Sequence, residues 1–86
     1  MRVIYARIFD KQYKKLPQDV RENFKQRRNI FLSSPFDPLL QNHALHGRYA
    51  HYRSINITGD YRAVYREWGD DIIEFAAIGT HAQLYG

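Results

Sequence analysis

The strongest constraint on the fold lies in the second half of the chain, where three segments typical of β-strands follow one another with very short connections. They cover about residues 48–57, 61–67 and 71–78, and Thr58-Gly59 and Gly69-Asp70 supply the turns between them. Connections this short leave no room for crossover helices. The three strands are therefore expected to form an antiparallel meander.

The first half of the chain predicts one further strand and two helices. Residues 2–8 alternate in a way typical of a strand, and from Phe9 the apolar residues recur at helical spacing. Asp10 could begin this first helix and Pro17 ends it, after which a second helix is expected to run to about Leu32. The order β-α-α-β-β-β predicts an α+β fold in which a helical pair covers one face of a twisted, four-stranded antiparallel sheet.

Length and composition are those of one small basic domain. The chain has 86 residues with 13 Lys+Arg against 9 Asp+Glu, a formal net charge of +4, so we expect a single domain over residues 1–86. The positive charge favours anionic partners, with nucleic acid first, although a merely soluble basic domain fits the charge equally well. The second helix carries a basic face of Arg21, Lys25 and Arg28, which could touch nucleic acid, but a charged outer face is typical of any solvated surface helix and that interpretation is favoured.

The sequence excludes several kinds of site. It contains no cysteine, which rules out disulfides, thiolate metal sites and cysteine nucleophiles and fits a reducing compartment. No apolar run is long enough to span a membrane, and arginine interrupts the N-terminus too early for a signal peptide, so a cytoplasmic location without a membrane partner is expected. Phosphate-loop, nucleophile-elbow and zinc-protease motifs are missing. His43 and His46 are three residues apart but have no nearby carboxylate, so neither a metal nor another cofactor is predicted.

Polar side chains lie along the predicted strands. The two-residue period puts Arg62 on the same face as Val64 and Arg66, and Arg62 is expected either to pair with Asp60 or to await an anionic ligand. On the preceding strand Tyr52, Ser54 and Asn56 share one face, while Arg53 shares the other with Ile55 and Ile57. His81 and Tyr85 follow the last strand, where a surface histidine in a frayed tail is the more common situation.

These residues give the chain a family resemblance. It resembles toxins of the RelE/StbE superfamily, closest to the YafQ branch, in four ordered segments of its C-terminal half: Asn42-His43-Ala44-Leu45-His46-Gly47, Tyr52-Arg53-Ser54-Ile55-Asn56-Ile57, Gly59-Asp60-Tyr61-Arg62-Ala63-Val64-Tyr65 and Ile78-Gly79-Thr80-His81-Ala82-Gln83-Leu84-Tyr85. The resemblance implies a microbial ribonuclease-like fold. It also implies the toxin of a type II toxin–antitoxin system, which enters the ribosomal A site and cleaves mRNA through attack of a 2′-hydroxyl on the neighbouring phosphate.

The resemblance also implies roles for particular residues. His43 and Asp60 match catalytic positions, and either could accept the 2′-hydroxyl proton, while His81 matches a general acid and Arg62 a phosphate-binding arginine. Expected substrate contacts are Arg53, Asn56 and Tyr85, the last by stacking on a base. Expected partners are a cognate antitoxin, the ribosome and mRNA, with operator DNA reached only through the antitoxin complex.

The chain also departs from the family pattern. Asn56 stands where YafQ-like proteins carry a further catalytic histidine, and Tyr52 and Ser54 replace basic residues of RelE. Because an asparagine cannot shuttle a proton, the acid–base set is thinner than in the relatives. Two alternatives therefore stay open: a ParE-type toxin that inhibits DNA gyrase by binding, and a catalytically inactive module that only binds its antitoxin.

Overall fold

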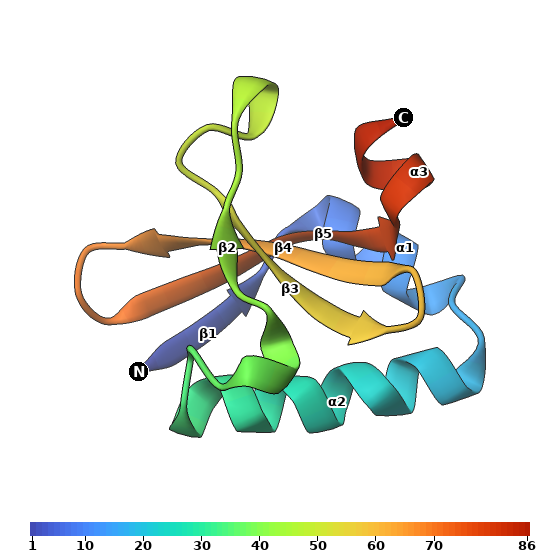
Figure 1. The fold of residues 1–86 in the computed structure, drawn as a ribbon, viewed down its shortest axis with the longest axis horizontal. Helices are drawn as coiled ribbons and strands as arrows, with labels where there is room; N and C mark the ends of the chain where they lie inside the picture. Colours follow the sequence, from blue (N-terminus) through green and yellow to red (C-terminus); the bar gives the residue numbers. More distant parts are fainter.

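A computed structural model describes all 86 residues, and they form a five-stranded sheet with two helices on one face and a short third helix beyond the opposite face (Figure 1). The strands lie in the order β1-β5-β4-β3-β2. Their bounds are Arg2–Tyr5 for β1, His43–Ala44 for β2, Arg53–Thr58 for β3, Tyr61–Trp68 for β4 and Ile72–Thr80 for β5. The helices are α1, Arg7–Lys14, α2, Gln18–Ser33, and α3, His81–Tyr85, with single 3-10 turns at Pro38–Leu40 and Gly47–Tyr49.

The predicted fold class is confirmed, and two details of the predicted sheet are wrong. The meander β3-β4-β5 is antiparallel, but β1 joins the free edge of β5 in parallel, so the sheet is mixed. The fifth strand is β2, whose two residues pair with the start of β3. So short a segment shows no alternation of polarity, and only its ladder bonds to β3 define it as a strand.

Three predicted element boundaries also move. The first strand ends at Tyr5 and α1 begins at Arg7, earlier than Asp10, because the Ala6 carbonyl already accepts the Asp10 amide hydrogen at 3.1 Å. The second predicted strand, expected from about residue 48, begins only at Arg53, since the residues before it include the turn at Gly47–Tyr49. The second helix ends at Ser33, within one residue of the predicted end.

The main core lies between the sheet and the helical pair. Phe9 of α1 and Phe24 and Phe31 of α2 are at most 2% exposed and pack against Phe75 of β5 and Tyr65 of β4. Phe75 is the centre of this cluster, with ring centroids of five aromatic side chains within 6.0 Å of its own. Aromatic burial of this kind is the largest single source of stability available to a chain of this length.

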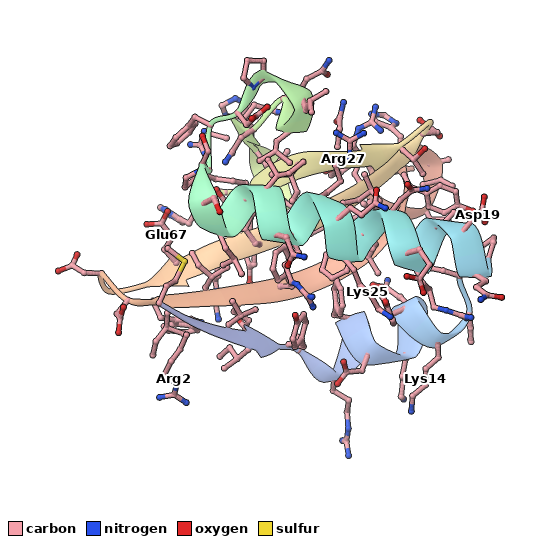
Figure 2. All side chains as sticks on the ribbon, turned by 90° about the horizontal axis from the view of Figure 1, so that it is seen from below. Arg2, Lys14, Asp19, Lys25, Arg27 and Glu67 are labelled. Carbon is pink, nitrogen blue, oxygen red and sulfur yellow. The ribbon has the colours of Figure 1, made fainter.

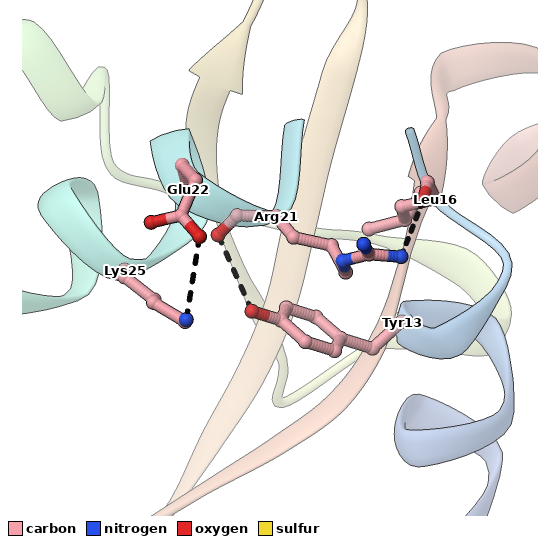
Figure 3. A network of polar contacts seen from close by, with 5 residues as sticks. All are labelled: Tyr13, Leu16, Arg21, Glu22 and Lys25. Atoms are coloured by element: carbon pink, nitrogen blue, oxygen red, sulfur yellow. Dashed lines mark hydrogen bonds and ion pairs between the residues drawn. The ribbon is translucent and has the colours of Figure 1, made fainter. Parts of the chain in front are cut away.

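The basic side chains of α2 serve the fold. Arg21 donates to the Leu16 carbonyl at 2.9 Å, and the Tyr13 hydroxyl donates to the Arg21 carbonyl at 3.3 Å, which ties the end of α1 to α2 (Figure 3). Lys25 pairs with Glu22 on the exposed face (Figure 3). Arg27 spans from α2 to β3, where it donates to the Ile57 carbonyl at 3.1 Å. Arg28, the third residue of the predicted basic face, donates to the Tyr5 hydroxyl at 3.1 Å. Arg21 and Arg28 are half-buried and only Lys25 is exposed, so the face makes local contacts where the sequence favoured a solvated surface.

No helix of the chain combines the length and the apolar character needed to cross a membrane. The longest helix, α2, lies along the sheet with charged side chains such as Lys25 and Asp19 pointing away from it (Figure 2).

Candidate active site

A cleft of about 250 Å³ opens on the face of the sheet opposite α2. Figure 1 shows its two walls standing above the sheet: the loop of residues 41–52 on one side and α3 on the other. The floor is formed by β3 and β4. The lining consists of His43, Leu45, His46, Tyr49, Ser54, Arg62, His81 and Tyr85.

A second, smaller apolar cluster fixes both walls to the sheet. Val64 of β4, Ala77 of β5 and Leu84 of α3 are buried together, and Tyr49, Tyr52 and Leu45 of the loop and Tyr85 of α3 pack against them. Arg48 adds a direct tie between the walls, because its Nη2 donates to the Leu84 carbonyl at 3.0 Å. The cleft is thus shaped by packing on both sides.

Arg62 lies on the cleft floor without a carboxylate partner. In the strand register it faces Asn56 of β3 and Gly79 of β5. Its Nη1 donates to the carbonyls of Gly59 at 2.9 Å and Tyr61 at 3.0 Å, and the three ion pairs of the chain join other residues. The Asp60 pairing considered from the sequence does not form, so the remaining guanidinium donors are free to bind an anion.

His43 has a defined tautomer. Its Nδ1 lies 2.9 Å from the carbonyl oxygen of Gln41. A carbonyl oxygen only accepts hydrogen bonds, so Nδ1 must carry the hydrogen. In the neutral ring this leaves Nε2 with a free lone pair, which is the form that a general base requires.

His81 stands on the opposite wall, at the first position of α3. The Thr80 hydroxyl accepts from the Gln83 amide at 3.2 Å and the Gln83 side chain accepts from the Thr80 amide at 2.8 Å, a capping box that begins the helix. The His81 amide donates to the Asp60 carbonyl at 3.1 Å, and its ring packs edge-on against Tyr85 with 4.9 Å between centroids. The frayed tail expected for this segment is wrong, because the cap and the burial of Leu84 order it.

Two buried hydroxyls at the cleft have no hydrogen-bond partner. They are Ser54 Oγ, on a residue with no exposed surface, and Tyr85 OH. Buried polar groups in native proteins are almost always hydrogen-bonded, and leaving one unpaired costs about 1–3 kcal/mol.

Three residues expected at the site lie outside this lining. Asp60 is exposed in the turn between β3 and β4, where it contributes only its backbone carbonyl to α3. Asn56 lies beside Arg62 and donates from Nδ2 to Gln41 Oε1 at 2.8 Å. Arg53 points away from the cleft, as its strand face predicts, and its guanidinium lies 5.3 Å from the ring centroid of Phe36.

Arg53 takes part in a network that holds the residue before His43. Its Nε donates to Asn42 Oδ1 at 2.8 Å, while Asn42 Nδ2 donates to the Pro35 carbonyl at 2.9 Å and to the Tyr65 hydroxyl at 2.8 Å. Burial raises the pKa of that Tyr65 hydroxyl above its ordinary value of 10.0, although Asn42 and Arg53 act in the opposite direction. Every bonding direction of the Asn42 amide except one lone pair is used, so the backbone entering His43 is fixed.

Sequence reasoning did not select four lining residues: Leu45, His46, Tyr49 and Ser54. The sequence suggests His46 only as a metal ligand beside His43. The two share the cleft, but no group of three or more His, Cys, Asp or Glu side chains in the chain is arranged to hold a metal ion. The only sequence feature that could have placed His46 in the cleft is its position three residues after His43. Ser54 could have been found from the strand period, because it shares a face with Asn56.

The comparisons with known proteins agree with this architecture. Among solved structures, YafQ from E. coli strain BL21(DE3) matches with a TM-score of 0.84 and 22% identity over 100% of both chains. A YoeB/ParE toxin from Agrobacterium tumefaciens matches with a TM-score of 0.79 and 24% identity, over 94% of this chain and 99% of the other. YafQ in the E. coli DinJ-YafQ toxin–antitoxin complex gives 0.81 and 23%, over 98% and 96%. No curated protein sequence matches the chain.

The chain thus has the α+β fold of the YafQ and YoeB structures. A family model described as the bacterial toxin of type II toxin–antitoxin systems, YafQ, matches residues 1–86. The chain belongs to this YafQ toxin family, as the resemblance in its C-terminal half predicted.

Proposed function

We propose that this toxin is an endoribonuclease that cleaves mRNA on the ribosome, and that the cleft between residues 41–52 and α3 is its active site. The observation on which this rests is the placing of His43 and His81 on opposite walls of one cleft with an unpaired Arg62 on the floor. Two proton-transfer groups flanking a cation are what phosphodiester cleavage by an internal hydroxyl requires.

In the proposed reaction His43 is the general base. Its Nε2 accepts the proton of the ribose 2′-hydroxyl, and the 2′-oxygen then forms a bond to the adjacent phosphorus. The bond from Nδ1 to the Gln41 carbonyl holds the ring and stabilises the imidazolium that forms. Asp60, the other base considered, is less suited because it does not line the cleft.

Arg62 and His81 complete the reaction. The free donors of Arg62 bind the non-bridging phosphate oxygens, whose negative charge grows as the phosphorane forms. His81 gives its proton to the leaving 5′-oxygen as the P–O5′ bond breaks. The products are a 2′,3′-cyclic phosphate and a 5′-hydroxyl end, so atoms and charge balance without a metal or cofactor.

The remaining partners follow from the charge of the cleft. We propose that a cognate antitoxin inhibits the toxin by placing an acidic segment against Arg62, as the E. coli relative is known in a complex with DinJ. Operator DNA would be reached only through that complex. A substrate engaged in translation places the activity in the cytoplasm.

The test is induced expression in a bacterial host, with primer extension on a translated transcript. The intact chain should stop growth and produce cuts inside reading frames. Arg62→Ala should reduce the cuts about tenfold or more, because hydrogen bonds to charged groups contribute about 1.5–3 kcal/mol. Arg7→Ala, which removes the same charge from an exposed position on α1, is the control and should cut like the intact chain.

Other outcomes of this test support other functions. Growth arrest without any cut would overturn the ribonuclease proposal and leave the gyrase-binding ParE-type function. Normal growth with well-expressed, folded protein would point to an inactive module that only binds antitoxin.

A prediction about Arg53 separates positioning from substrate binding. Arg53→Ala leaves Asn42 Oδ1 without its donor, so the backbone before His43 loosens, and we expect kcat to fall about tenfold to a hundredfold with little change in KM. Steady-state kinetics on ribosomes programmed with mRNA measure both constants. A rise in KM at unchanged kcat would instead assign Arg53 to RNA binding.

A further inference from the structure

Beyond the cleft, the same face of β4 carries an aromatic and cationic ledge formed by Tyr52, Arg66 and Trp68. The Arg66 guanidinium carbon lies 3.9 Å from the Trp68 ring centroid and 5.2 Å from that of Tyr52. Glu74 of β5 accepts from both Arg66 Nε and Trp68 Nε1 at 3.1 Å. One carboxylate and one guanidinium thus hold an indole that is 46% exposed.

The ledge continues the floor of the cleft. Residues two apart along a strand share a face, so Arg62, Val64, Arg66 and Trp68 form one row. Val64 belongs to the cluster beneath the cleft walls and Tyr52 packs against the same cluster, which confirms the shared face. At about 3.3 Å per residue the row extends roughly 20 Å from Arg62 to Trp68, a distance of a few nucleotides along an extended strand.

The row from Arg62 to Trp68 carries basic side chains that can bind a polyanion, whereas the turn after Trp68 carries carboxylates that repel one. Arg62 has no carboxylate partner, and Arg66 keeps its terminal nitrogens while Glu74, only 19% exposed, is occupied by its two donors. Beyond Trp68 the turn to β5 carries Asp70 and Asp71, of which Asp71 pairs with the N-terminal amine at 3.3 Å. Two carboxylates in succession disfavour phosphate, so the row ends at the indole.

We propose that this ledge binds single-stranded RNA next to the scissile nucleotide, with a base stacked on Trp68 and a phosphate on Arg66; the proposal rests on the ribonuclease function above. Aromatic faces held beside a basic groove are the usual means by which proteins bind unpaired bases. An exposed indole held by a hydrogen bond and a cation is ordered before the base arrives, which lowers the entropy cost of stacking.

The fluorescence of Trp68 reports directly on RNA bound at the ledge, because Trp68 is the single tryptophan of the chain. The probe is a mixed-sequence 2′-O-methyl oligoribonucleotide at low ionic strength, whose blocked hydroxyls prevent the proposed cleavage. Titration should quench or shift the Trp68 emission, whereas a dinucleotide, too short to span the row, should not. Fluorescence anisotropy of the end-labelled oligonucleotide gives the affinity independently.

Variants of Trp68 test whether its indole stacks on a base of the bound RNA or takes no part in binding. Trp68→Ala should raise the Kd about fivefold or more, since base stacking on an aromatic contributes about 1–3 kcal/mol, while Trp68→Phe should retain most of the affinity. Phe36→Ala is the matched control, because Phe36 is 69% exposed and also stacked on an arginine but lies outside both the cleft and the row.

The proposal is overturned if the oligonucleotide binds with unchanged Trp68 emission, if Trp68→Ala binds as tightly as the intact chain, or if the oligonucleotide does not bind at all. The first two results leave mRNA cleavage intact. A Trp68-dependent Kd in a chain that never cuts mRNA would support the ledge and contradict the proposed function.

Discussion

His81→Ala lowers the rate of mRNA cleavage by about 10²–10⁴-fold, the usual contribution of a positioned general acid. The 5′-oxygen leaves poorly without a proton. Of the residues of α3, only His81 and Tyr85 line the cleft, and His81 is the only histidine on this wall. Single-turnover cleavage on ribosomes programmed with mRNA measures the chemical step directly.

Two comparisons distinguish loss of the general acid from a loss of folding in His81→Ala. The His81 side chain makes no hydrogen bond, and its amide bond to Asp60 survives the substitution, so the thermal unfolding midpoint should change little. His51→Asn, at an exposed histidine outside the cleft, should keep nearly the full rate. An unaltered cleavage rate in His81→Ala would mean that another group donates the proton to the leaving 5′-oxygen.

Phe75→Ala destabilises the fold by about 3–5 kcal/mol, the cost of removing a buried phenyl group and leaving a cavity. Phe75 has no exposed surface, and rings from α1, α2, β1 and β4 surround it, so few side chains can move into the space. Since domains have about 5–15 kcal/mol of total stability, much of it is lost. Urea denaturation followed by circular dichroism measures the change.

Phe36→Ala provides the contrast, because the same atoms are removed where the ring is 69% exposed. A change below about 1 kcal/mol is expected there. Comparable losses for the two variants would mean that the aromatic cluster around Phe75 is not the main support of the fold.

The main strands and helices of the fold could be predicted because each is long enough for its polarity pattern to be recognised in the sequence. Strands β4 and β5 are eight and nine residues long and are separated by a glycine turn, and the buried positions Val20, Phe24 and Phe31 follow the helical period. Elements of two and five residues, β2 and α3, are too short for periodicity. For α3 the sequence held a different signal, the capping box Thr80-His81-Ala82-Gln83, which predicts a helix start where a frayed tail was expected.

The positions of site residues could be predicted on strands, where the two-residue alternation fixes the direction of each side chain. They could not be predicted in turns and loops, which have no such period. Within each strand the two-residue period placed Arg62 on the face of Val64 and separated Ser54 from Arg53, and both predictions are confirmed. That Arg62 and Ser54 share the cleft follows from the pairing of β3 with β4, which the period does not give. Asp60 lies in a turn, where no period fixes its side chain, and only its carbonyl reaches α3. His46 joins the cleft because the loop doubles back at Gly47, whose positive φ of 67° permits the turn.

The most direct test of the account is cleavage of mRNA carrying one 2′-deoxynucleotide at the mapped cut, on purified ribosomes with purified toxin. If a 2′-hydroxyl is the nucleophile, the all-ribose transcript is cut to a 2′,3′-cyclic phosphate and a 5′-hydroxyl end, and the single 2′-deoxy substitution abolishes that cut. Cleavage at the deoxy position would assign the attack to water. No cleavage of either transcript by folded toxin would contradict the assignment of this cleft as a ribonuclease site.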